Sequence, residues 1–205
     1  MRKQIKSLSV AFAATLLLGA CASPSKIANE SSANTETSSV SADTSDTAKT
    51  LVYGTSSYGV GMSDAGLNPH EDYSGWSCVR YGVGETLFRL NENIELVPWL
   101  ADSYKFVDDN TLEVVIKEGI NFSSGRKLDA AAAKECFEDL IAVHDRAPKD
   151  MKIQEIKADG QTITFVTTEP NPALLNFLAE PYTAIIDMQA GVDVNKNVSG
   201  TGPYK

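Results

Sequence analysis

Two hairpin patterns between residues 94 and 170 restrict the fold of this chain more than any other feature. Residues 94–106 and 111–122 alternate apolar and polar side chains, which is typical of half-buried strands. One face of the second segment carries Leu112, Val114 and Ile116. Only the stretch VDDN connects the two segments, so we expect them to pair antiparallel. Pro98 has no amide hydrogen to donate, which confines the first segment to a sheet edge or a bend.

A second hairpin is predicted over residues 151–170, with Asp159-Gly160 as the turn between two short strands. Between the two hairpins, residues 129–143 are predicted to form a helix that Asp129 caps at its N-terminus. The apolar positions of this helix make one stripe, which consists of Ala133, Cys136, Phe137, Leu140 and Ile141.

Shorter elements complete the prediction. The apolar run that starts at residue 50 predicts a strand that breaks at Gly54. Residues 74–90 fit a helix only loosely because Gly82 and Gly84 weaken it. Residues 171–180 are expected to form a short helix and residues 182–187 another strand. Together these elements predict a mixed α/β body with antiparallel strand pairs.

The N-terminus has the pattern of a secretion signal. Residues 1–6 contain three basic side chains and no acidic one, and residues 8–18 are apolar apart from Ser9 and Thr15. This run is about half of the roughly 20 residues that a membrane-spanning helix needs. We therefore expect residues 1–20 to be removed as a signal peptide.

The signal ends in Leu-Gly-Ala-Cys, which resembles the bacterial lipobox, so Cys21 is the expected site of lipidation; the alternative is an ordinary signal peptide in which this cysteine is incidental. In residues 22–49, 12 of 28 residues are Ser or Thr and none is aromatic. Such a segment cannot bury enough apolar surface to offset its ordering entropy. Residues 21–49 are therefore expected to be a lipidated, disordered tether.

The remaining residues, 50–205, are enough for one domain with its own core. Removing the three basic residues of the signal leaves 15 basic against 27 acidic residues, a net charge of −12, which argues against a nucleic-acid partner. Cys78 and Cys136 are the other two cysteines. They could pair outside the cell, but we expect free thiols because small buried thiols are the commoner state.

Four ordered motifs resemble one known family. These are LNPH, the long segment that begins at ETLFRLN, EPNPALLNFLAE and GTGPYK, and the most specific agreement lies in residues 101–122. They are similar to the family 5 solute-binding proteins of bacterial ABC importers, the peptide and nickel group. The resemblance implies a type II periplasmic-binding-protein-like α/β fold, of which this chain holds the first lobe, with a mixed sheet and antiparallel strands. In that family GTGPY lies well inside the chain, so residues 50–205 resemble a solute-binding domain whose second lobe is missing.

The resemblance implies capture and delivery rather than catalysis. The expected protein is a monomeric lipoprotein on the extracytoplasmic side of the cell membrane, which hands a short peptide or a nickel chelate to an ABC permease with its ATPase subunits. No cofactor is expected, since a nickel chelate would be the transported ligand.

Six residues are candidates for ligand contact. The loop at residues 55–59 follows the first strand, where such clefts form, and contributes Thr55, Ser56 and Tyr58; the alternative is a plain turn. Tyr73 and Trp76 follow LNPH at a spacing that places side chains in the cleft of nickel-type members, although both could simply fill the core. Nickel-type relatives also place an arginine where Arg146 stands, to grip a ligand carboxylate. The alternative is that Arg146 is a solvated charge beside Asp145 with no role in binding.

Other functions are less well supported. His70 and His144 are far apart in sequence and lack partners at ligand spacing, so direct metal ligation is not expected and His70 is assigned to a turn or to packing. A tethered surface hydrolase would need a nucleophile with a base beside it, and no such pair is evident in the sequence. A receptor or chaperone-like lipoprotein of the same fold, without transport, is a third possibility.

Overall fold

The computed structural model of the chain describes residues 66–204. Several predictions concern residues outside this range and are not tested by it. These are the signal peptide (1–20), the lipidated cysteine and tether (21–49), the strand that starts at residue 50, and the loop candidates Thr55, Ser56 and Tyr58.

The described residues form helices and strands in a mixed order. They are α1 (Ser74–Arg80), β1 (Phe88–Leu90), β2 (Leu96–Pro98), β3 (Ala101–Asp108), β4 (Thr111–Ile116), α2 (Ala130–Val143), α3 (Ala147–Met151), β5 (Ile153–Asp159), β6 (Thr162–Thr167), α4 (Leu174–Phe177) and the 3-10 helix η1 (Pro181–Thr183). None of the helices within residues 66–204 combines the length and the hydropathy that a membrane span requires.

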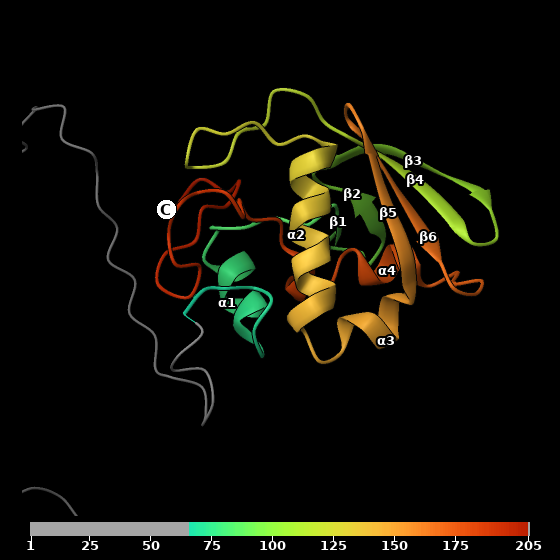
Figure 1. Cartoon of the computed structure of the whole chain (residues 1–205), viewed down its shortest axis with the longest axis horizontal. Helices are drawn as coiled ribbons and strands as arrows, with labels where there is room; N and C mark the ends of the chain where they lie inside the picture. Colours follow the sequence, from blue (N-terminus) through green and yellow to red (C-terminus); the bar gives the residue numbers. More distant parts are fainter. Residues whose placement is uncertain (1–65, 205) are drawn as a thin grey trace, which may run out of the picture. The chain divides into compact units, whose positions relative to one another are not determined.

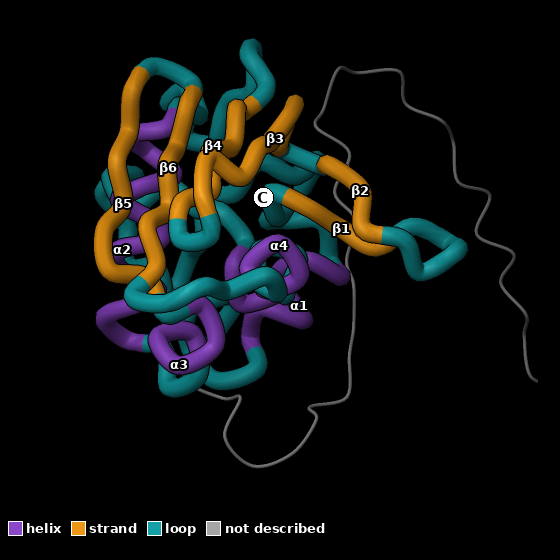
Figure 2. The backbone as a smooth tube through the Cα atoms, turned by 90° about the vertical axis from the view of Figure 1, so that its right-hand side faces the viewer, coloured by secondary structure: helices purple, strands orange, loops and turns teal. Residues whose placement is uncertain are grey.

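The main sheet has four strands in the order β3-β4-β6-β5, and β1 and β2 form a separate pair. Figure 2 shows the four strands side by side. Every pairing between these strands is antiparallel, so the predicted antiparallel pairs are confirmed, whereas no mixed sheet is present within residues 66–204.

The second predicted hairpin is confirmed, and so is the antiparallel pairing of the first. The segment predicted over residues 94–106, however, divides into β2 and β3, which lie in different sheets, and β3 is exposed beyond Ala101 rather than half-buried. In the first, Phe106 pairs with Leu112, and the two strands join through residues 109–110. In the second, Asp159 pairs with Thr162, and Gly160 adopts φ +57° in the turn. That left-handed conformation is one that glycine adopts without steric cost, which explains why this turn is predictable from sequence. Pro98 ends the short edge strand β2, as expected.

Helix α2 packs against β5 and β6 and covers one face of the main sheet (Figure 1). The Asp129 carboxylate accepts a hydrogen bond from the Ala132 backbone N–H at 2.8 Å, which confirms the predicted N-cap. Phe137 of the helix meets Phe165 of β6 edge to face, with ring centroids 5.0 Å apart. The predicted apolar face of β4, which consists of Leu112, Val114 and Ile116, is buried in the core.

Two further predicted elements differ from the structure. The loose helix over residues 74–90 is limited to α1, which ends at Arg80. The strand predicted over residues 182–187 is wrong: Pro181, whose fixed φ suits the first helical position, begins a 3-10 helix, and Ile185 and Ile186 then form only isolated bridges. The apolar character of this segment instead reflects burial in the core.

The two remaining cysteines, Cys78 and Cys136, are free and buried, which confirms the prediction of free thiols. Burial raises the pKa of the Cys78 thiol well above its ordinary value. It therefore behaves as a small apolar core residue rather than as a reactive group.

The GTGPY motif packs directly on the chain that follows α1. The Gly202 and Tyr204 amides donate hydrogen bonds to the carbonyls of Val83 (2.9 Å) and Gly82 (3.2 Å). A Cβ atom at Gly200 would lie 2.0 Å from the Val83 carbonyl oxygen. Glycine is required at that position because the two backbones leave no room for a side chain.

Candidate functional site

A cavity of about 260 Å³ is bordered by three segments that are distant in sequence. Residues 70–76 form one side. Residues 143–146, at the end of α2 and in its connection to α3, form the second, and Glu180 and Tyr182 form the third. The cavity thus lies where the start of α1, the end of α2 and the turn η1 meet.

Three of the predicted ligand residues line this cavity: Tyr73, Trp76 and Arg146. Tyr73 is 66% exposed and Trp76 is 54% exposed. The alternative that these two aromatic residues fill the core is therefore wrong. Large aromatic side chains this exposed, beside a cavity, offer open ring faces to a solute.

Arg146 is held at the cavity by two contacts. Its guanidinium Nη2 lies 3.1 Å from Asp150 Oδ2, and its Cζ lies 5.7 Å from the centre of the Tyr182 ring. The side chain is still 57% exposed. The sequence suggested a solvated charge beside Asp145 as the alternative, whereas Asp150, one helical turn later, is the partner that the structure gives.

His144 fixes the relative positions of the segments around the cavity. Its Nδ1 accepts hydrogen bonds from the backbone N–H groups of Arg146 (3.1 Å) and Ala147 (3.0 Å), at the start of α3. A backbone hydrogen bond with Asp72 joins the same ring to the loop before α1. Burial, together with the positive charge of Arg146, lowers the pKa of His144. The ring therefore stays neutral and keeps Nδ1 as an acceptor.

His70 is held through both ring nitrogens. Its Nδ1 lies 2.7 Å from Asp139 Oδ2, and its Nε2 lies 3.4 Å from Cys136 Sγ. Burial opposes protonation, but the neighbouring Cys136 and Asp139 outweigh this effect and raise the pKa of His70 to about 9. The residue is 1% exposed, so the prediction of a packing role is confirmed.

Cys136, His70 and Asp139 stand in the order of a nucleophile, a base and an orienting acid. The expectation that this segment contains no nucleophile beside a base is therefore wrong, because folding joins residues 66 positions apart. However, Cys136 is 2% exposed, and its sulfur accepts the Ile186 amide at 3.4 Å. A thiol with so little surface does not reach a substrate, so the arrangement does not favour a hydrolase.

No group of three His, Cys, Asp or Glu side chains within residues 66–204 is placed to hold a metal ion. The ring nitrogens of His70 both contact protein atoms, and Nδ1 of His144 accepts two amides. In the described conformation, both imidazole rings therefore stabilise the fold through hydrogen bonds.

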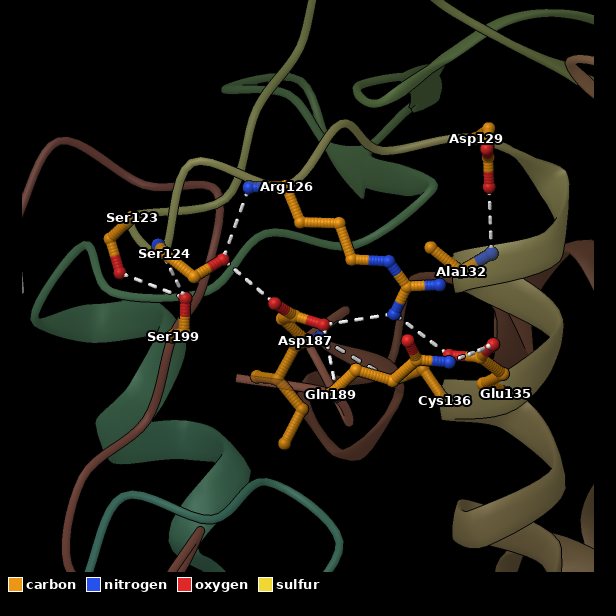
Figure 3. Close-up of polar contacts among 11 residues, drawn as sticks. Ser123, Ser124, Arg126, Asp129, Ala132, Glu135, Cys136, Asp187, Gln189 and Ser199 are labelled. Atoms are coloured by element: carbon orange, nitrogen blue, oxygen red, sulfur yellow. Dashed lines mark hydrogen bonds and ion pairs between the residues drawn. The ribbon is translucent and has the colours of Figure 1, made fainter. Parts of the chain in front are cut away.

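Sequence reasoning missed a polar network centred on Arg126, shown in Figure 3. Arg126 Nη1 lies 2.8 Å from Glu135 Oε2 in α2 and 2.9 Å from Asp187 Oδ1, and the Ser124 hydroxyl donates to Asp187 Oδ2 at 2.7 Å. Burial opposes ionisation of Asp187, but the bonds from Ser124 and Arg126 lower its pKa. No spacing in the sequence links residue 126 to residue 187, so no pattern could reveal this contact.

Comparison with known proteins adds a family match. The model of "Bacterial extracellular solute-binding proteins, family 5 Middle" matches residues 95–205. The nickel-binding protein NikA of Staphylococcus aureus is 36% identical over 127 residues, which cover 62% of this chain and 26% of that protein. The glutathione-binding protein GsiB of Escherichia coli O1:K1 is 31% identical over 156 residues, which cover 71% and 30%. The chain thus spans less than a third of the length of these relatives.

Solved structures agree with the fold. S. aureus NikA in complex with Ni(L-His)2 matches with a TM-score of 0.66 at 34% identity, over 69% of this chain and 30% of that one. A nickel ABC transporter protein from Bacillus halodurans matches with a TM-score of 0.64 at 35% identity, over 68% and 29%. These matches support the predicted periplasmic-binding-protein type II architecture over part of its length.

Proposed function

The chain belongs to the family 5 bacterial extracellular solute-binding proteins, which bind solutes rather than transform them, and on that premise we propose that it captures a short peptide or a nickel chelate for an ABC importer. Delivery would be to the permease and ATPase subunits of that importer. The described residues form part of one lobe of such a protein, and closure of two lobes around the solute would supply most of the burial.

The observation that carries this proposal is the convergence of Tyr73, Trp76 and Arg146 on one cavity. Exposed ring faces can stack on a planar solute, and the guanidinium keeps donors free for a carboxylate beyond the one directed at Asp150. Thr55, Ser56 and Tyr58 are proposed as further contacts.

Two kinds of cargo are compatible with the relatives. S. aureus NikA binds nickel and was solved with Ni(L-His)2, whereas GsiB binds glutathione, a tripeptide. For nickel, we propose capture as a complex with a small chelator, because the histidine nitrogens described above make hydrogen bonds within the fold. The chelator, rather than the metal, would then meet the aromatic rings and Arg146.

We further propose that lipidation of Cys21 holds the protein at the outer side of the cell membrane, with residues 21–49 as a tether. A Cys21→Ala variant should lose incorporation of radiolabelled palmitate and move from the membrane fraction to the medium. Retention of the label in that variant would contradict lipidation at this residue.

The proposed function is tested by thermal unfolding of the full chain with nickel-histidine and with a set of di- and tripeptides. A solute at a hundred times its Kd stabilises the folded state by about 2.7 kcal/mol, which raises Tm by about 5–10 °C for a domain of this size. Nickel chloride without histidine is the matched control and should leave Tm unchanged.

Equal melting with every solute would contradict capture. Catalytic turnover of any of these solutes would favour the hydrolase instead. Binding without recovery of any permease subunit after cross-linking in cells would favour the receptor function over transport.

A further inference from the structure

The cavity is strongly acidic. Four of its lining side chains, Glu71, Asp72, Asp145 and Glu180, are acidic. None of these four carboxylates forms an ion pair with another residue in the described part of the chain. Their charge is therefore not neutralised internally and acts on whatever enters the cavity.

The basic side chains that line the cavity, Arg146 and the protonated His70, are both already paired with carboxylates. Arg146 forms its ion pair with Asp150, whose Oδ2 also accepts a hydrogen bond from the Tyr182 hydroxyl at 3.2 Å. The Asp150 carboxylate offsets part of the guanidinium charge, so the remaining N–H donors can orient a solute carboxylate but attract an anionic solute less strongly. With four acidic side chains against Arg146 and the protonated His70, the lining keeps a formal excess of two negative charges.

The aromatic residues favour the same sign of charge. The face of Tyr182 already holds a cation, the Arg146 guanidinium. Tyr73 and Trp76, both largely exposed, line the same cavity as the four carboxylates. The negative face of an aromatic ring attracts ammonium groups, and a nearby carboxylate adds to that attraction.

We propose that this cavity selects solutes that carry an ammonium-bearing, net positive group, a short cationic peptide in the first instance, and disfavours anionic solutes such as glutathione. The inference rests on the proposed function and restricts the class of solute that the protein would capture. The aromatic residues and the carboxylates recognise different parts of the solute. The rings of Tyr73 and Trp76 cover the apolar stem of the solute's basic side chain, and the four carboxylates surround its charged end.

The test is isothermal titration of the full chain with the tripeptides Ala-Lys-Ala, Ala-Gln-Ala and Ala-Glu-Ala, which match in length and differ in charge. At 50 mM NaCl the lysine peptide should bind about tenfold more tightly than the glutamate peptide, with the glutamine peptide between them. At 1 M NaCl, where the Debye length falls to about 3 Å, the difference should shrink.

A double variant, Asp145→Asn with Glu180→Gln, should reduce the preference for the lysine peptide. The matched control is Asp109→Asn with Glu118→Gln, which removes the same charge from exposed positions outside the cavity and should leave the preference intact.

Binding of all three peptides without this order, or an equal effect of both double variants, would overturn the inference and leave the proposed function standing. Failure of every peptide and of nickel-histidine to bind would overturn the proposed function, and the inference with it.

Discussion

His70 Nδ1 lies 2.7 Å from Asp139 Oδ2, and this contact joins the loop before α1 to helix α2. His70 also lines the candidate cavity, so the ion pair fixes one wall of the cavity to the core of the domain. Both binding geometry and stability therefore depend on it.

The contacts of His70 with Cys136 and Asp139, which outweigh its burial and raise its pKa, predict a pH-dependent stability. The folded pKa of about 9 lies above the ordinary value of 6.5, so the contribution is complete below pH 6.5 and is lost as the pH rises through 9. The shift corresponds to a loss on the order of 3 kcal/mol. Thermal melts should show a lower Tm at pH 9.5 than at pH 6.5. In His70→Gln, which cannot titrate, most of this difference should vanish; the same fall in both proteins would contradict the assignment.

The helix cap gives a second prediction. Asp129→Ala removes the acceptor for the Ala132 amide and should destabilise the domain by about 1 kcal/mol. Urea unfolding measures this change. Asp129→Ser, which keeps a capping oxygen, is the control, and equal loss in both variants would argue against a capping role.

The Arg126 network should be costly to break from one side. Arg126→Met leaves the Asp187 carboxylate, 1% exposed, without its cation, and the expected loss is about 3 kcal/mol. Adding Asp187→Asn should recover part of this loss, because the amide carries no charge. A double-mutant cycle in urea tests the coupling, and strictly additive effects would refute it.

Gly200 and Gly119 should respond differently to alanine. At Gly200 the new Cβ would lie 2.0 Å from the Val83 carbonyl oxygen, an atom of the backbone, and the expected cost is about 3 kcal/mol or more. At Gly119 the Cβ has open space, and only the backbone conformation, φ +79°, is unfavourable, at about 1–2 kcal/mol. Thermal unfolding of both variants measures this difference. Equal Tm values would contradict the close approach of Gly200 to the Val83 backbone.

Trp76→Ala should separate binding from stability. Because Trp76 is 54% exposed, the free energy of unfolding should change by no more than about 0.5 kcal/mol, whereas affinity for a bound solute should fall about tenfold. Phe106→Ala is the matched control, since Phe106 is 44% exposed on β3 outside the cavity. Isothermal titration and thermal unfolding of both variants test this prediction. Equal loss of affinity in the two variants would show that the cavity does not bind the solute.

Local patterns were enough for much of the fold. The Asp159-Gly160 turn, the Asp129 cap and the alternation in β4 each depend on residues within a few positions of one another, so the sequence predicts them directly. The segment at residues 182–187 misled this reasoning because apolar residues buried in irregular structure have the same composition as a buried strand.

The sequence by itself determined the family, the hairpins, the main helix and the acidic balance, and it named Tyr73, Trp76 and Arg146 as separate candidates. Only the tertiary structure decided that these three side chains share one cavity, and that Asp150 rather than Asp145 is the partner of Arg146. The physical reason is that secondary structure depends on short-range periodicity and turn chemistry, whereas a site depends on how packing of the core brings residues some 70 positions apart into contact.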